Sequence, residues 1–141
     1  MRVSLDTNII VGIWSGTPEG QRDLLTLQHL QQGGDELLVC GVVYTELCAH
    51  PGMNRSRVDA FLTSTNIDLD SSMPPTVWAD AADVNHAYQV RRRRGGVSIP
   101  KRVVPDFLIG AHALHRADRL MTRNGADFND FPTLTLFVPV P

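Results

Sequence analysis

Three polar residues, Asp6, Thr7 and Asn8, interrupt two segments that favour burial, Arg2–Leu5 and Ile9–Val11. Apolar and polar residues alternate over 2–5, which predicts a short strand that ends just before Asp6. In an open parallel sheet, ligands bind beyond the carboxyl ends of the strands, so a carboxylate there is a candidate ligand for a hard cation. An Asp at this position can equally cap the following helix, and the triplet alone leaves both interpretations open.

Glu46 is the second candidate acid, on a helix that is predicted to begin at Gly41. Its neighbours one turn away are apolar: Val42 and Val43 before it and Ala49 after it. This spacing places Glu46 at the border of the buried face, where an unpaired carboxylate is costly. A Glu that reaches from that border into water has the same spacing, so this alternative stays open.

Asp106 is the third candidate, directly after Pro105 at the predicted start of a helix. A carboxylate there also caps free amides and complements the helix dipole. Gly110, Ala113 and Ala117 fall close to the azimuth of Asp106 on a helix of 3.6 residues per turn. Such a stripe of small residues lets the helix pack closely and brings the acid towards another element.

Asp127 is the fourth candidate, in a turn with the sequence Asn124-Gly125 that follows a predicted strand. An ordinary turn Asp is the alternative interpretation. Asp130 is a nearby substitute that the sequence does not exclude.

Carboxylates that gather in one crevice repel one another and stay ionised together only if a cation neutralises them. Their oxygen atoms select hard ions, so Mg²⁺ is expected, with Mn²⁺ as the alternative, and zinc is not. A divalent ion held in this way activates water and stabilises the charge that develops on a phosphodiester. The chemistry open to these acids is therefore metal-dependent hydrolysis.

Predicted strands and helices alternate along the chain, which implies right-handed crossovers and a mainly parallel sheet. The predicted strands are Arg2–Leu5, Glu36–Cys40, an edge strand at 67–70, Leu120–Thr122, and a last strand through Leu134, Leu136 and Val138. The predicted helices run from about Pro18 to Gly33, Gly41 to about His50, Ser56 to Ser64, Thr76 to about Arg93, and onward from Pro105. We expect one domain over 1–141 with a three-layer α/β/α fold and about five strands.

On the helix from Thr76, the residues expected to face inward are Val77, Trp78, Ala81, Ala82, Val84 and Tyr88. A loop is expected over 95–104. His112 and His115 lie well around the next helix from Asp106 and are expected to be packed or solvated histidines.

The composition is that of an ordinary globular protein, without an apolar run long enough to cross a bilayer and without a recognisable leader. Cys40 and Cys48 form no CxxC pattern and have no matching His pair, so we expect free thiols in a cytoplasmic protein.

The net charge of −2 argues against nucleic-acid binding through the whole surface, but the charge is unevenly distributed. Nine of the thirteen Lys and Arg residues lie between Arg91 and Arg123. The run Arg91, Arg92, Arg93 and Arg94 is either a solvated helix end or a phosphate-binding segment, with both interpretations open.

Four motifs occur in the order and spacing of a PIN domain, and the chain resembles most the VapC-like toxins of type II toxin–antitoxin systems. They are Leu5-Asp-Thr-Asn8, Thr45-Glu-Leu47, Pro105-Asp-Phe-Leu-Ile-Gly-Ala-His-Ala113 and Thr122-Arg-Asn-Gly-Ala-Asp-Phe128. The resemblance covers essentially the whole chain. Two departures concern substrate fit more than catalysis: the loop 95–104 is longer than usual, and Gly110 stands where Ala is common.

The resemblance implies an Mg²⁺-dependent endoribonuclease that cuts structured RNA and is blocked by a cognate protein antitoxin. It also implies a homodimer or a higher toxin–antitoxin assembly, away from membranes. The implied catalytic and metal-binding quartet is Asp6, Glu46, Asp106 and Asp127, with Asn8, Thr122 and Asn124 as supporting polar groups.

Two alternatives are kept. One is a catalytically silent PIN module that only binds RNA or a protein partner, although clustered acids do not help RNA binding. The other is a phosphoryl-transfer enzyme on a different doubly wound fold, which would need a second acid close to Asp6 and a Lys. Position 8 is Asn and the only Lys is Lys101, which counts against this alternative.

Overall fold

The protein is described by a computed structural model that covers residues 1–95 and 101–140. Its centre is a sheet of five strands in the order β3-β2-β1-β4-β5, with every neighbouring pair parallel. The strands are β1 (Arg2–Leu5), β2 (Glu36–Cys40), β3 (Asp68–Asp70), β4 (Arg119–Met121) and β5 (Leu136–Phe137). The predicted parallel sheet is therefore confirmed, and so is the edge position of the strand at 68–70.

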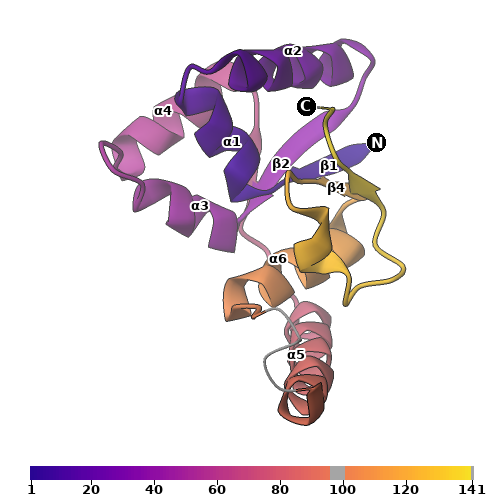
Figure 1. The fold of residues 1–141 in the computed structure, drawn as a ribbon. Helices are drawn as coiled ribbons and strands as arrows, with labels where there is room; N and C mark the ends of the chain where they lie inside the picture. The colour runs from indigo at the N-terminus through magenta and orange to yellow at the C-terminus, as the bar shows by residue number, and fades with distance from the viewer. Residues whose placement is uncertain (96–100, 141) are drawn as a thin grey trace.

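Helices lie on both sides of the sheet, which completes the predicted three layers. The helices are α1 (Thr7–Trp14), α2 (Pro18–Gln32), α3 (Gly41–Cys48), α4 (Arg55–Thr65), α5 (Pro75–Gly95) and α6 (Val104–Arg116), with a short 3₁₀ helix η2 (Gly125–Phe128). Figure 1 shows α1–α4 grouped together and α5 and α6 grouped on the other side of the strands. None of the described helices is long and apolar enough to cross a membrane.

Helix α1 is an element that the sequence analysis did not assign. Ile9 and Ile10 are both fully buried and form its inner face. The next helix, α2, begins where predicted because Pro18 occupies its first position and the Thr17 hydroxyl accepts a hydrogen bond from Gly20 N–H at 3.1 Å. The polar triplet after β1 is thus followed at once by a helix.

The prediction for the inner face of α5 was partly wrong. Val77, Ala81 and Tyr88 are buried as expected, but Trp78 is 52% exposed and Ala82 is also exposed. Helix α5 packs mainly on one neighbour, α6, so only a narrow stripe is covered. Trp78 is one residue beyond Val77, about 100° around the helix, and falls outside that stripe.

Two predicted strand ends also differ from the structure. Strand β4 ends at Met121, so Thr122 belongs to the turn that follows it. Strand β5 has only two residues, and Val138 lies beyond it with 53% of its surface exposed. Of the loop predicted over 95–104, residues 96–100 lie outside the described residues, and α6 begins at Val104.

The small residues of α6 permit the close packing that their spacing predicted. A Cβ atom added at Gly110 would lie 2.5 Å from the nearest ring atom of Phe131. The ring therefore packs directly against the helix backbone. This contact brings the segment after η2 against α6, one turn from Asp106.

Candidate functional site

Asp6 is held at the carboxyl end of β1 by three hydrogen bonds to its carboxylate. Oδ1 accepts from the backbone N–H of Thr7 at 2.8 Å, as in a helix cap. Oδ2 accepts from the Thr122 hydroxyl at 2.7 Å and from the Asn8 amide at 3.2 Å. Asp6 therefore caps α1 and also presents a buried carboxylate at the carboxyl end of the central strand, so the two interpretations are compatible.

Asn8 and Thr122 connect the loops after β1 and β4. The Asn8 side chain donates to Thr122 Oγ1 at 3.3 Å and accepts from the backbone N–H of Arg123 at 3.1 Å. Thr122 Oγ1 also accepts from the backbone N–H of Asn124 at 3.0 Å. Asn8 and Thr122 thus contact Asp6 with their side chains, whereas Asn124 contributes its backbone to this network.

Glu46 reaches the same region from α3. Its Oε1 accepts a hydrogen bond from the Thr7 hydroxyl at 2.6 Å, and the residue is exposed. It therefore lies at the border between buried face and water. Thr7 is a site residue that the sequence analysis did not select, although its place beside Asp6 in the triplet was a usable signal.

Asp106 lies in the first turn of α6 and is half-buried. Its Oδ2 accepts from the backbone N–H of Val103 at 3.4 Å, a long contact. The carboxylate therefore remains largely available for another ligand.

The charges of the four acids act on one another. The pKa of Asp6 is raised to about 6, first by burial and then by the charges of Glu46 and Asp106, against the opposing hydrogen bonds from Thr122 and Thr7. The pKa of Asp106 is also raised, first by burial and then by the charges of Asp127 and Glu46. These mutual effects place the predicted acids around a common region.

Asp127 and Asp130 have different surroundings. Asp127, in η2, lies 3.9 Å from Arg102 Nη1, and its charge acts on Asp106. Asp130 is engaged in a close ion pair with Arg91 of α5. Of these two acids, Asp127 is the one whose charge acts on Asp106.

The donor set suits a hard cation, since every candidate ligand is a carboxylate oxygen. Within the described residues, no group of three Asp, Glu, His or Cys side chains is arranged closely enough to hold one metal ion. Mg²⁺ usually keeps several waters and binds one or two carboxylates, so it does not need three. Asp6 and Asp106 fit this requirement best, because burial and neighbouring carboxylates both raise their pKa values and a cation would offset both effects.

Two arginines near the site were missed as site residues. Arg102 lies four positions before Asp106, and its charge lowers the pKa of that carboxyl. Arg123 pairs with the buried Asp23 of α2, with Nε at 3.0 Å from Oδ2. The spacing to Asp106 was a signal for Arg102, whereas the pairing of Arg123 with Asp23 depends on the tertiary fold.

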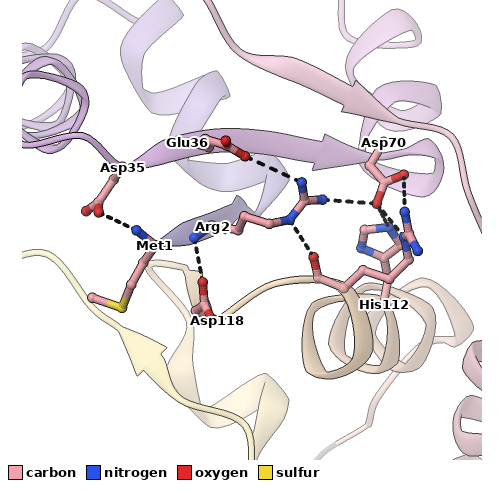
Figure 2. A network of polar contacts seen from close by, with 8 residues as sticks. Met1, Arg2, Asp35, Glu36, Asp70, His112 and Asp118 are labelled. Carbon is pink, nitrogen blue, oxygen red and sulfur yellow. Dashed lines mark hydrogen bonds and ion pairs between the residues drawn. The ribbon is translucent and has the colours of Figure 1, made fainter.

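The histidines of α6 belong to other contacts. His112 is fully buried, and its Nε2 lies 3.1 Å from Asp70 Oδ2, which also contacts Arg116 and Arg2 (Figure 2). His115 Nε2 lies 2.6 Å from a carboxylate oxygen of Asp80 on α5. Neither contacts the four candidate acids, so they join α6 to its neighbours.

The arginine run ends α5. Arg92, Arg93 and Arg94 occupy the last turn of the helix, and Arg93 and Arg94 are exposed. Arg91 is held by Asp130, whereas neither Arg93 nor Arg94 forms an ion pair within the described part of the chain. The run is thus a helix end, with two side chains available to a ligand.

The profile of the PIN domain family matches residues 3–134. This chain belongs to the PIN domain family. The match extends from β1 to the segment before β5, so it includes every candidate acid of the PIN site.

Known structures show the same fold over nearly the whole PIN domain. The chain is similar to the VapBC2 complex of Rickettsia felis bound to promoter DNA, with 23% identity, a TM-score of 0.64, and 99% and 100% of the two chains covered. VapBC-1 of nontypeable Haemophilus influenzae shares 20% identity at a TM-score of 0.65, covering 98% of each chain. A toxin–antitoxin complex of Klebsiella pneumoniae shares 23% identity at 0.61, with 99% and 97% covered. Comparison with curated protein sequences gave no match.

Proposed function

We propose that this PIN domain is a metal-dependent endoribonuclease and the toxin component of a toxin–antitoxin system. The observation that carries the proposal is the buried carboxyl of Asp6, whose pKa is raised to about 6 in a region shared with Glu46 and Asp106. Such an arrangement is unfavourable without a cation, and acids of this kind do not help the binding of RNA alone. The likeness to VapBC complexes supports the toxin assignment.

Asp6 and Asp106 would hold Mg²⁺, or Mn²⁺ in its place, with Glu46 and Asp127 completing the set directly or through water. When bound, the ion supplies an activated water and stabilises charge on the phosphodiester.

The chain's own residues position these groups. Thr122 and Asn8 fix the Asp6 carboxylate, and Thr7 fixes one oxygen of Glu46. Glu46 is exposed, so its carboxylate can accept a proton from the attacking water.

The proposed partners are an RNA substrate and a protein antitoxin, in a homodimer or a larger toxin–antitoxin assembly. Three of the similar structures are described as bound to DNA, which is a property of those complexes. We place the protein in the cytoplasm, since Cys40 and Cys48 are free thiols, as expected in a reducing compartment.

Purified protein should cleave labelled transfer or ribosomal RNA with Mg²⁺ and leave it intact in EDTA. Expression should arrest bacterial growth, and Asp106→Asn should relieve the arrest by removing a metal ligand. Asp80→Asn is the matched control, because Asp80 pairs with His115 away from the acids. Binding of RNA without cleavage, together with normal growth, would instead favour a silent binding module.

The arginine run gives a prediction about the substrate. Changing Arg93 and Arg94 to Ala should weaken RNA binding and flatten its dependence on salt by about one unit of slope for each lost phosphate contact. Binding is measured in EDTA over a salt series, with an Arg22→Ala, Arg55→Ala double variant as control, since both arginines are exposed on other helices. An unchanged slope would identify the run as a solvated helix end.

A further inference from the structure

Arg102 is a largely buried cation at the edge of the acidic region. Only 10% of its side chain is exposed, although the residue lies in the segment before α6. Its backbone N–H donates to the Tyr88 hydroxyl at 2.6 Å, and its Nη2 donates to the Ala126 carbonyl at 2.8 Å. The first contact holds the backbone of Arg102 against α5, and the second holds its guanidinium against η2.

The guanidinium is held in place but not neutralised. Its nearest carboxylate oxygen is on Asp127, 3.9 Å from Nη1, which is beyond hydrogen-bond distance. Its Nε is buried and has no hydrogen-bond partner within the described residues. Arg123 shows the contrast, since its Nε and Nη2 both bind the carboxylate of Asp23. Arg102 therefore keeps donors that have no partner among residues 1–95 and 101–140.

Position distinguishes Arg102 from Arg119, one of two other arginines whose buried Nε has no partner among the described residues. Arg119 also has a buried Nε without a partner, but it lies at the start of β4, near Asp35 and over the Phe137 ring. Arg102 instead lies near Asp127, and its charge acts on Asp106. Its guanidinium is thus near two of the candidate carboxylates.

A phosphodiester that approaches the carboxylates is repelled by them, and its own charge concentrates on the non-bridging oxygens during hydrolysis. A bound divalent ion offsets only part of the charge of four acids. A fixed guanidinium supplies the missing positive charge and planar donors that match phosphate oxygens. The side chain stays protonated throughout, so it takes no part in the proton balance of hydrolysis.

We propose that Arg102 binds a non-bridging oxygen of the scissile phosphodiester and stabilises the charge that develops there. This role rests on the proposed ribonuclease function. The competing explanation is a purely structural one, in which Arg102 only ties the segment before α6 to Ala126.

The test uses the full chain with two substitutions, Arg102→Met and Arg102→Lys, and the control Arg119→Met. Arg119 is comparably buried, at 18% exposure, and its carboxylate partner Asp35 is similarly distant at 3.7 Å. Thermal melts in EDTA identify a temperature at which every variant is folded. Cleavage of bulk transfer RNA in Mg²⁺ and binding of the same RNA in EDTA are then measured.

Arg102→Met is expected to lower kcat/KM by about 10²–10³-fold, as for other groups that stabilise transition-state charge. The slope of log Kd against log salt in EDTA should fall by about one unit, because one phosphate contact is lost. Arg102→Lys should recover part of both effects, while Arg119→Met should leave both unchanged.

Several results would overturn the inference. One is a kcat/KM of Arg102→Met equal to that of the wild-type protein. Another is an unchanged slope of log Kd against log salt. A third is an equal loss of kcat/KM in Arg102→Met and Arg119→Met after correction for the amount of folded protein. If the wild-type protein itself fails to cleave RNA in Mg²⁺, the proposed ribonuclease function is wrong, and that outcome is separate from the failure of Arg102.

Discussion

Asp6→Asn is expected to make the metal-free protein more stable at pH 8 and to abolish RNA cleavage. The folded-state pKa of Asp6 is about 6, against an ordinary value of 3.8. A carboxyl whose pKa is higher in the folded than in the unfolded state stabilises the fold. This stabilisation is complete at a pH below the unfolded-state pKa. This contribution is lost as the pH rises through the window from 3.8 to about 6. Above that window the ionised side chain costs about 3 kcal/mol.

The substitution also removes a favourable interaction. The carboxylate of Asp6 accepts three hydrogen bonds, and an amide has only one acceptor oxygen, so the cap to Thr7 or the bond to Thr122 is weakened. One such bond contributes about 1 kcal/mol. The expected net gain at pH 8 is therefore about 2 kcal/mol. At pH 3 to 4 no gain is expected, because Asp6 is then protonated in the folded state.

Thermal melts at pH 4 and pH 8, in EDTA and in Mg²⁺, measure both effects. Mg²⁺ should stabilise the wild-type protein and do much less for Asp6→Asn, because the variant loses a ligand in the folded state. Asp35→Asn is a control with the opposite sign. The N-terminal ammonium lowers the pKa of Asp35, so removal of the Asp35 carboxylate should destabilise the protein at pH 8. If Asp6→Asn is less stable at pH 8 in EDTA and gains as much from Mg²⁺ as wild type, Asp6 is only a helix cap.

The sheet could be predicted because local signals agreed with the fold. The alternation over Arg2–Leu5 and the buried run Glu36–Cys40 both specify strands, and the turn residues between elements fix where helices begin. The inner face of α5 could not be predicted in full. Its hydrophobic pattern includes Trp78, but the width of the buried stripe depends on how many elements cover the helix.

Asp6 and Asp106 could be selected because they stand at the end of a strand and the start of a helix, whereas Glu46 was selected by its apolar neighbours and Asp127 by the turn that contains it. Their common location depended on the topology, since Asp6 and Asp106 are a hundred residues apart in the chain. Sequence could not separate Asp127 from Asp130, because the distinction rests on the pairing of Asp130 with Arg91 in space. The importance of Arg102 likewise depends on its burial, which the sequence does not specify.

Gly20→Ala is expected to destabilise the protein, whereas Gly12→Ala on the facing helix is not. Gly20 of α2 packs on Gly12 of α1, and an added Cβ would lie 2.0 Å from the Gly12 carbonyl oxygen and 2.8 Å from its carbonyl carbon. Both atoms belong to the backbone, so the helices must separate. Overpacking of this kind costs about 1–3 kcal/mol and occasionally more. The higher helix propensity of Ala offsets only about 1 kcal/mol of this cost.

Gly12→Ala provides the matched control on the other side of the same contact. Apart from its chain neighbours and the nearby backbone of α1, no atom lies within 4 Å of a Cβ added at Gly12, and this residue is inside a regular helix. The substitution should therefore be neutral or stabilising by up to about 1 kcal/mol. Urea unfolding of both variants in EDTA gives the comparison, and equal stabilities would show that α1 and α2 do not pack as closely as described.

Activity gives a second measure of the same contact. Helix α1 carries Thr7 and Asn8 in its first turn, beside Asp6, so a displacement of α1 moves the groups that hold the candidate acids. Gly20→Ala should therefore lower RNA cleavage per folded molecule, whereas Gly12→Ala should leave it unchanged. Full activity in a strongly destabilised Gly20→Ala protein would mean that the packing of α1 on α2 does not set the position of the acids. The sheet would then set it, through the hydrogen bond from Asp6 N–H to the Met121 carbonyl.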